Sequence, residues 1–326
     1  MNKNSLIHLN TNKQLITMKT PKPTRVLKPF DNSNIEIRLF GRPRDWSIAA
    51  LNEEGLKKLA DETGAAFAKI HGITADARVQ TLYAPRPTEF NAVVCDHKDL
   101  QLTFSTDMDA MVEADFPENW DISVCRGVNA DGCDVPKGSA FWLSSADCPT
   151  LIVTDGRRVI CAHCGYKSLV DLQALVGKPT RPYFSVVDAV IAEFTKISVP
   201  PKKLKAFVTL GIGPHFVVMR SVRQEIDHEG DRILVYEKEK FATHEANWKK
   251  ARFFKTTPSY DIATDIRKLT ECQCLNRGIG NVRVDDNDTF ADKDKDGKFL
   301  WWSYERAMKQ SPADKLKRNG VMVIHH

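Results

Sequence analysis

The sequence lacks the long apolar segments that mark membrane proteins. No run of 18 apolar residues occurs among its 326 residues, which argues against an ordinary membrane-spanning helix. The N-terminal segment MNKNSLIHLNTNKQL also lacks the apolar core of a secretory signal peptide. From these two absences we expect a cytoplasmic protein with no membrane partner.

A disulfide framework is absent as well. Small secreted domains use closely spaced cysteines to compensate for a small core, whereas a chain of 326 residues, 42% of them hydrophobic, can bury a core of its own. We therefore expect most of the eight cysteines to be reduced, in agreement with a cytoplasmic location. They lie at positions 95, 125, 133, 148, 161, 164, 272 and 274.

Neither sign of charge dominates the chain. It contains 47 basic and 42 acidic residues, a net charge of +5, and the basic residues form no concentrated stripe. A nucleic-acid-binding surface needs such a stripe, so we expect no nucleic-acid partner. The small basic surplus would suit an anionic substrate such as phosphate.

The most informative stretch runs from Ser144 to Leu169 and reads SSADCPTLIVTDGRRVICAHCGYKSL. Two short apolar runs, LIV and VICA, flank a DGRR turn, which is the pattern of a β-hairpin. Such a hairpin would bring Cys148, at the start of its first strand, beside His163, at the end of its second. A thiolate and an imidazole together form either a zinc site or a nucleophile–base pair. A buried structural cysteine and a hydrogen-bonded core histidine would leave the same pattern.

Hydrophobic periodicity predicts an α+β fold for the chain as a whole. Hairpins and amphipathic helices in one sequence indicate mixed β-sheets layered with helices, in a single domain over residues 35–326. The polar, Lys-rich segment 1–34 is predicted to be a mobile tail or a loose first strand. The expected strands cover residues 35–40, 79–85, 90–96, 207–216, 281–289 and 321–326, and the expected helices cover residues 52–71, 168–176, 186–197 and 260–278.

A possible calcium loop is also present near the C-terminus. Asp292, Asp294 and Asp296, followed by Gly297, form the D-x-D-x-D-G opening of an EF-hand loop. An EF-hand loop needs a bidentate glutamate at its twelfth position, and here that position is Ser303. We therefore expect a solvated acidic turn rather than a calcium site.

The two halves of the hairpin carry a family resemblance. SADCPTLIV followed by CAHCGYKSL resembles the paired signature of the laccase-domain family, TADC-x-P and HAGWRG. Its members are known as polyphenol oxidases and are understood as zinc-dependent purine nucleoside phosphorylases with adenosine deaminase activity. Cys148 and His163 match the metal-binding Cys and His of that family, whereas Tyr166 and Lys167 replace its Trp and Arg.

Two later motifs extend the resemblance from about residue 52 to the end of the chain. GIGP at 211–214 matches the family's IGP loop, where glycine permits close approach of the backbone to a ligand or to another strand. WWSYER at 301–306 resembles the family's FFSYRR, with Arg306 on the second Arg and Glu305 in place of the first. Residues 101–129 look like an insertion relative to the family.

The resemblance implies a specific fold, chemistry and site. The fold would be a single laccase-domain-like, cysteine-hydrolase-like α+β domain. The activity would be that of a purine nucleoside phosphorylase or an adenosine deaminase, with small-molecule nucleosides and phosphate as partners. Cys148 and His163 would bind a catalytic zinc, and the cationic side chains Lys167 and Arg306 would bind phosphate.

One element of the family's site has no counterpart in the sequence. The family's third zinc ligand is a histidine in a Q-V-H-G motif, and that motif aligns with Tyr83–Arg86, with Pro85 at or near the histidine. No histidine occurs between residues 72 and 96. His71 and His97 are the nearest substitutes, although a helix C-terminus and a solvated turn account for them equally well.

Three hypotheses follow from this gap. In the first, the chain is a divergent nucleoside-processing enzyme whose third zinc ligand comes from elsewhere. In the second, Cys148 is a nucleophile and His163 its base, without metal, as in toxin deamidases of similar fold. In the third, the chain is a catalytically inactive homologue that acts as a binding protein.

Overall fold

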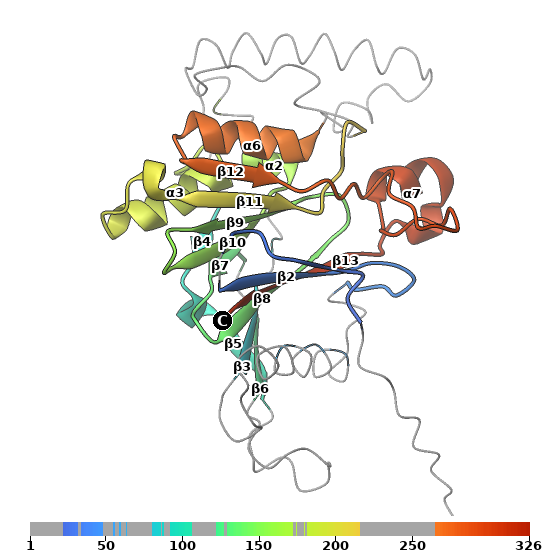
Figure 1. Cartoon of the computed structure of the whole chain (residues 1–326), viewed down its shortest axis with the longest axis horizontal. Coiled ribbons are helices and arrows are strands. Elements are labelled where there is room, and N and C mark those ends of the chain that lie inside the picture. Colours follow the sequence, from blue (N-terminus) through green and yellow to red (C-terminus); the bar gives the residue numbers. More distant parts are fainter. Residues whose placement is uncertain are drawn as a thin grey trace, which may run out of the picture.

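Two β-sheets stack face to face, and helices cover the outer face of one of them (Figure 1). Both sheets contain parallel and antiparallel strand pairs, which confirms the predicted α+β class with mixed sheets. The computed structural model describes residues 22–31, 34–47, 55, 59, 63, 80–85, 87, 92–105, 122–126, 129–171, 174, 179, 181–215 and 265–326.

The C-terminal strand lies inside the first sheet. This strand, β13 (Asn319–His325), pairs antiparallel with β2 (Ile35–Phe40) on one side and with β8 (Ser139–Ser145) on the other. The strand order is β1-β2-β13-β8-β3-β6-β5, so both ends of the described chain contribute to one sheet. The remaining strands of this sheet are β1 (Arg25–Leu27), β3 (Gln80–Ala84), β5 (Gln101–Ser105) and β6 (Ile122–Arg126).

The predicted hairpin forms the centre of the second sheet. Its strands β9 (Thr150–Thr154) and β10 (Val159–His163) pair antiparallel, with Thr150 opposite His163, and Gly156 in the turn has a φ of 95°. The strand order is β12-β11-β9-β10-β7-β4. The outer strands are β4 (Val94–Cys95), β7 (Gly132–Asp134), β11 (Lys205–Thr209) and β12 (Asn281–Val284).

Capping side chains define where the two long described helices begin. Ser185 and Asp188 form a reciprocal capping box at the start of α3, and Asp265 accepts hydrogen bonds from two backbone N–H groups at the start of α6. No helix in these described ranges combines the length and apolar character needed to cross a membrane. The α-helices are α2 (Tyr166–Leu169), α3 (Val186–Lys196), α6 (Ile266–Asn276) and α7 (Tyr304–Gln310), and the 3₁₀ helices are η1 (His97–Asp99), η4 (Pro201–Lys203) and η6 (Pro312–Asp314).

Alternation along the central strands creates two apolar layers. On β10, Ile160 and Ala162 face the helices, whereas Val159 and Cys161 face the first sheet. All four are completely buried, which explains why this strand is continuously apolar in sequence. The helix layer adds Leu169, Val187, Val190, Phe194, Ile266 and Leu269, and the first sheet adds Ile37, Leu39, Phe141, Leu143, Val321 and Val323.

Several predicted elements differ in extent from the observed ones. The helix predicted over residues 168–176 is only partly confirmed: α2 begins at Tyr166 and ends at Leu169, with Ser168 inside the helix rather than at its cap and Val170 extended. Residues 172, 173, 175 and 176 of this prediction lie outside the described residues. The strand predicted over 90–96 is reduced to β4, and the strand predicted over 207–216 ends at Thr209, before the GIGP turn.

Two further predictions fall partly outside the described residues. Residues 25–27 of the predicted N-terminal tail form β1, whereas residues 1–21 are not described. Of the helix predicted over 52–71, Gly55, Leu59 and Thr63 are described and helical. Leu59 and Thr63 are buried, and the Thr63 hydroxyl lies 3.3 Å from the sulfur of Met322 on β13.

A glycine on β13 generates a testable prediction for the fold. A Cβ atom at Gly320 would lie 2.1 Å from the buried ring of Trp142, so Gly320→Ala should force that ring out of its packed position. We expect the free energy of unfolding to fall by about 1–3 kcal/mol in urea denaturation.

The double variant Gly320→Ala/Trp142→Phe serves as the control. The smaller ring should relieve the clash, so the two substitutions together should cost less than the sum of their separate costs. If the two losses in the free energy of unfolding are additive, a clash with the Trp142 ring is not the reason why Gly320→Ala is destabilising.

Candidate active site

The hairpin places Cys148 and His163 side by side, as the sequence predicts. The Cys164 N–H donates to the Pro149 carbonyl across the strand ends (2.8 Å), which ties the segment holding Cys148 to the end of β10. A Cβ atom on Gly165 would lie 2.7 Å from His163 Cε1, so a larger residue there would displace the imidazole, and it would lie 3.4 Å from both the Cys148 sulfur and His163 Nε2. Cys148 is partly exposed and His163 is 5% exposed.

A third residue, Asp131, lies behind the histidine. The backbone N–H of His163 donates to the backbone carbonyl of Asp131 (2.7 Å). In the side chains, His163 Nδ1 lies 3.5 Å from Asp131 Oδ1. The carboxylate is completely buried and is held by hydrogen bonds from the Ser168 hydroxyl (2.6 Å) and the Ala92 N–H (2.7 Å). Cys148, His163 and Asp131 therefore lie one behind the other, in the order in which thiol hydrolases place a nucleophile, a base and an orienting carboxylate.

Sequence reasoning did not identify Asp131. It lies in the segment Ala130-Asp131-Gly132, which carries no catalytic motif. Its role depends on strand pairing, because β7 lies against β10 and brings residue 131 opposite residue 163. The spacing of the two residues along the chain does not reveal this contact.

The surroundings of His163 favour the protonated imidazole. Burial alone would lower the pKa of His163, but the charge of Cys148 and the contacts with the Asp131 carboxylate and the Cys148 thiol outweigh it and raise the pKa to about 9. This shift favours the imidazolium form of His163 at neutral pH. Such a group next to a thiol stabilises the thiolate form, which is the reactive form of cysteine.

The motif residue Asp147 anchors the segment that holds Cys148. Its carboxylate accepts hydrogen bonds from the Thr289 hydroxyl (2.7 Å) and from the Glu305 N–H at the start of α7 (2.8 Å). Its carbonyl accepts from the Ile212 N–H of the GIGP turn (2.9 Å). Three segments that are distant in sequence are thus joined at the residue before Cys148.

The two glycines of the GIGP turn pack closely against other segments of the chain. A Cβ atom on Gly211 would lie 2.9 Å from the side chain of Pro149, and one on Gly213 would lie 2.2 Å from the Asp288 carboxylate. The Gly213 N–H donates to that carboxylate (3.1 Å). Of the two predicted reasons for glycine here, close approach to another segment is the one that the structure shows.

A cavity of about 370 Å³ opens beside the thiol and imidazole, a volume typical of small-molecule sites. Tyr304, Glu305 and Arg318 bring polar and charged groups to its wall. The other lining residues are Pro87, Ser144, Ser145, Ala146, Asp147, Cys148, His163 and Ile266.

No third zinc ligand from the described residues joins Cys148 and His163. Pro87, just beyond β3, lines the cavity near the point where the family's third histidine was expected. His97 lies elsewhere, and His71 is outside the described residues. A catalytic zinc site needs three protein ligands, so the described residues supply an incomplete set here.

His97 belongs to a separate group of potential metal ligands. Its Nδ1 lies 2.9 Å from Asp134 Oδ2 and 3.2 Å from Asp96 Oδ1. Asp96, His97 and Asp134 are thus close enough to hold a metal ion. The three groups also satisfy one another through hydrogen bonds, because His97 N–H donates to Asp134 Oδ1 (2.8 Å).

The two predicted phosphate ligands lie in different environments. Lys167 is exposed on α2, two residues after Gly165. Arg306 is 5% exposed, donates to the carbonyls of Thr289 and Phe290 (3.0 and 2.7 Å), and does not line the 370 Å³ cavity. Binding of phosphate by Lys167 and Arg306 stays a prediction.

In the acidic turn at residues 292–297, the carboxylates of Asp292 and Asp294 accept hydrogen bonds from nearby N–H groups of the protein. Asp294 Oδ1 accepts hydrogen bonds from the N–H groups of Asp296 and Lys298, both at 2.9 Å. Asp292 Oδ2 accepts from the Asp288 N–H and from the indole N–H of Trp301 (3.1 and 3.0 Å). These contacts agree with a turn stabilised by hydrogen bonds.

Comparisons with known proteins identify the fold. No family model matches the sequence, and no curated protein matches it significantly. Among solved structures, YlmD from Geobacillus stearothermophilus matches with a TM-score of 0.50 and 12% identity, over 92% of this chain and 94% of that chain. This match shows a shared fold and confirms the predicted resemblance at the level of the fold.

Two further solved structures also match. NMB0706 from Neisseria meningitidis, described as a DUF152 protein, has a TM-score of 0.47 and 15% identity, over 92% of this chain and 97% of that chain. The hypothetical protein YfiH from Bacillus licheniformis has a TM-score of 0.47 and 10% identity, over 90% and 93% of the two chains. All three matched proteins belong to the laccase-like YfiH family.

The raised pKa of His163 predicts a pH-dependent contribution to stability. A group whose pKa rises from 6.5 in the unfolded chain to about 9 in the folded protein stabilises the fold below pH 6.5 and loses that contribution as the pH rises towards 9. The contribution is roughly 3 kcal/mol at most. The stability advantage of the wild type over His163→Asn should therefore shrink between pH 6.5 and pH 9.

Urea denaturation across this pH range measures the difference, and Asp131→Asn is the matched variant. Loss of the carboxylate charge should lower the pKa of His163 and move the loss of stability to lower pH. A wild-type advantage that stays constant from pH 6.5 to pH 9 would contradict the assigned ionisation of His163.

Proposed function

We propose that the chain is a cysteine hydrolase that cleaves amide bonds at Cys148, with His163 as general acid and base. The contact series from Cys148 through His163 to Asp131 supports this proposal most directly. Cys–His pairs with an orienting third group are typical of thiol hydrolases. The cavity beside Cys148 offers room for a small substrate or for one side chain of a larger one.

The proposed reaction has two steps. The Cys148 thiolate attacks the carbonyl carbon of an amide, and the imidazolium of His163 gives its proton to the departing amine as the C–N bond breaks. The product is a thioester on Cys148. Neutral His163 then removes a proton from water, which attacks the thioester, releases a carboxylic acid and restores the thiolate and imidazolium.

Asp131 has a positioning role in this scheme. Its buried carboxylate faces Nδ1 of His163, which leaves Nε2 for Cys148 and the substrate. The hydrogen bonds from Ser168 and Ala92 hold the carboxylate in that orientation. The carboxylate also stabilises the imidazolium that exists before the first step.

A second candidate is a zinc-dependent purine nucleoside phosphorylase or adenosine deaminase. The fold shared with YlmD and the match of Cys148 and His163 to the family's metal ligands favour it. Zinc bound there would acidify water or polarise a leaving group. The third ligand would have to come from outside the described residues, where His71, His228 and His244 lie.

Alkylation by iodoacetamide tests the first candidate. At pH 6–7, Cys148 should react about tenfold or more faster than Cys272, because burial raises the pKa of the half-buried Cys272 thiol. Peptide mass spectrometry distinguishes the two sites within one sample. Both His163→Asn and Asp131→Asn should slow the alkylation of Cys148 and leave the alkylation rate of Cys272 unchanged. Equally slow alkylation of the two cysteines in the wild type would rule out an activated thiol at Cys148.

Metal content separates the two candidates. For the cysteine hydrolase we expect the purified protein to carry no zinc that depends on Cys148, as measured by inductively coupled plasma mass spectrometry. About one zinc per chain that disappears in Cys148→Ala and persists in His97→Ala would instead establish the zinc enzyme. The His97→Ala variant is needed because Asp96, His97 and Asp134 form a separate group of potential ligands.

A further inference from the structure

Two arginines near α7 have no carboxylate partner among the described residues. Arg306 is buried and donates to backbone carbonyls, and its guanidinium lies over the Phe299 ring at 3.7 Å. Arg42 is half-buried, with its guanidinium over the Trp302 ring at 4.1 Å. Burial lowers the pKa of the Arg306 guanidinium, and the positive charge of Arg42 lowers it further, to about 10.

A second cavity opens where these groups meet solvent. Its volume is about 560 Å³, larger than that of the cavity beside Cys148. Arg42 and Lys298 bring positive charge to its wall, and Phe299 brings an aromatic ring. The other lining residues are Pro43, Asp294 and Leu300.

The wall that holds Arg42 is rigidly connected to its surroundings. The Arg42 N–H donates to the Leu300 carbonyl (2.9 Å), and the indole N–H of Trp302 donates to the Arg44 carbonyl (2.8 Å). The Trp302 N–H donates to the Asn319 side chain (2.7 Å). The ring beneath Arg42 is therefore fixed, and the guanidinium is positioned before any ligand arrives.

The charge balance at this cavity favours an anion. Asp294 is the one acidic residue in the lining, and its Oδ1 already accepts two backbone hydrogen bonds. Arg42, Lys298 and the nearby Arg306 outnumber it. An oxyanion would relieve the repulsion between the two guanidinium groups and would accept hydrogen bonds from the guanidinium N–H groups of Arg42, for which the described residues offer an aromatic ring but no acceptor oxygen.

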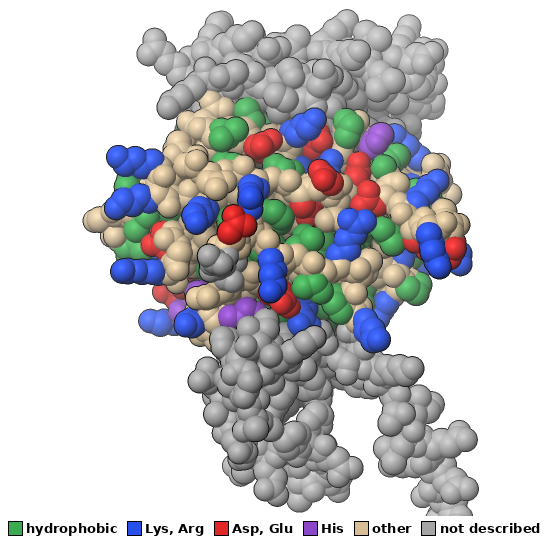
Figure 2. All heavy atoms as spheres, viewed as in Figure 1, with side chains coloured by type: hydrophobic (Ala, Val, Ile, Leu, Met, Phe, Trp, Pro, Cys, Tyr) green, Lys and Arg blue, Asp and Glu red, His purple; other side chains and the backbone are tan. Residues whose placement is uncertain are grey.

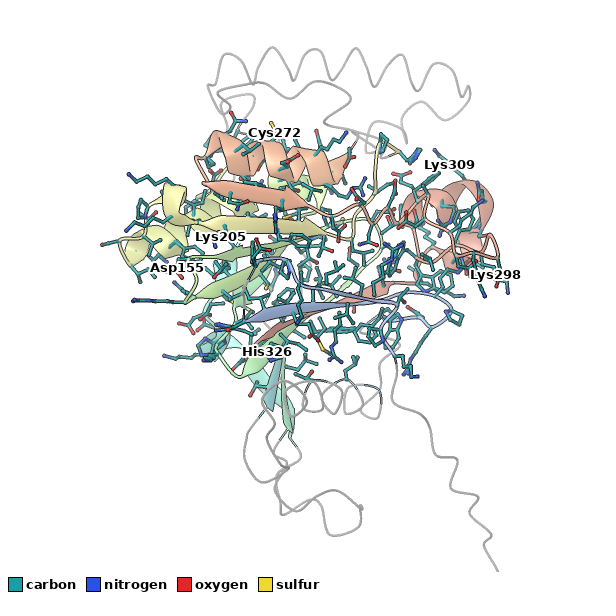
Figure 3. The ribbon with its side chains drawn as sticks, in the orientation of Figure 1. Asp155, Lys205, Cys272, Lys298, Lys309 and His326 are labelled. Atoms are coloured by element: carbon teal, nitrogen blue, oxygen red, sulfur yellow. The ribbon has the colours of Figure 1, made fainter. Side chains whose placement is uncertain are left out.

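Further basic side chains lie near this cavity. Lys and Arg side chains lie over α7 and the neighbouring loops, as they also do over the opposite end of the described surface (Figure 2). Lys298 and Lys309 lie at the α7 end, far from Asp155 in the β9–β10 turn (Figure 3). The basic surroundings would raise the local concentration of a small anion.

We propose that the cavity lined by Arg42, Lys298 and Phe299 binds a phosphate group, either as inorganic phosphate or as part of a small phosphate ester. The site is separate from the Cys148 cavity, because the two cavities share no lining residue. The proposal therefore does not depend on the chemistry at Cys148. Arg42 supplies a planar donor fork, and Lys298 supplies a second charge.

Isothermal titration calorimetry with inorganic phosphate and with AMP, at constant ionic strength, tests the proposal on the full chain. Wild-type protein should bind phosphate saturably, and Arg42→Gln should weaken binding by about tenfold or more. Arg157→Gln is the matched control, because it removes the same charge from the exposed β9–β10 turn. It should bind phosphate as tightly as the wild type.

Tighter binding of AMP than of phosphate, lost in Arg42→Gln, would identify a phosphate ester as the ligand, and equal binding would identify inorganic phosphate. If Arg42→Gln does not fold, Lys298→Gln takes its place, with a smaller expected loss because Lys298 is exposed. No saturable binding by the wild type, or equal weakening in Arg157→Gln, would overturn the proposal. The alkylation rate of Cys148 should be unchanged in Arg42→Gln, which separates this site from the catalytic one.

Discussion

The burial of the β9–β10 hairpin on both faces is the constraint on which the rest of the structure depends. One face packs against the helices and the other against the first sheet, so a slip by one residue would exchange the side chains fitted to the helices with those fitted to the first sheet. This register puts Thr150 opposite His163 and holds Cys148 at the same end of the sheet. The position of the thiol and the imidazole is thus a consequence of packing.

The residues around the hairpin complete the site through contacts between distant segments. β7 brings Asp131 to the back of His163, and α7 and the GIGP turn anchor Asp147. The same strand pairing that builds the second sheet therefore also brings the Asp131 carboxylate to His163, where it adds to the effect of Cys148 in raising the pKa of the imidazole. A backbone hydrogen bond joins His163 to Asp131, and the Cys148 carbonyl accepts a hydrogen bond from the Ser145 hydroxyl (2.7 Å), so contacts outside the side chains themselves fix the site.

Two neighbouring residues in the first turn of α7 lie beside two different cavities. Glu305 faces the cavity of Cys148, and Arg306 faces the aromatic side chains beneath the second cavity. One helix thus contributes an acidic group to the first cavity and a basic group next to the second. The two proposed sites can be tested separately because different side chains line them.

Local sequence pattern determined the hairpin, the α+β class, the capped helix α3 and the closeness of Cys148 to His163. Each of these depends on residues that are near in sequence or on a regular apolar period. Asp131 beside His163, the use of Arg306 to hold carbonyl groups and the pairing of β1 with β2 were decided only by the tertiary structure. These contacts join segments that fold together because their apolar faces pack, and no local pattern in the chain specifies which polar groups that packing brings together.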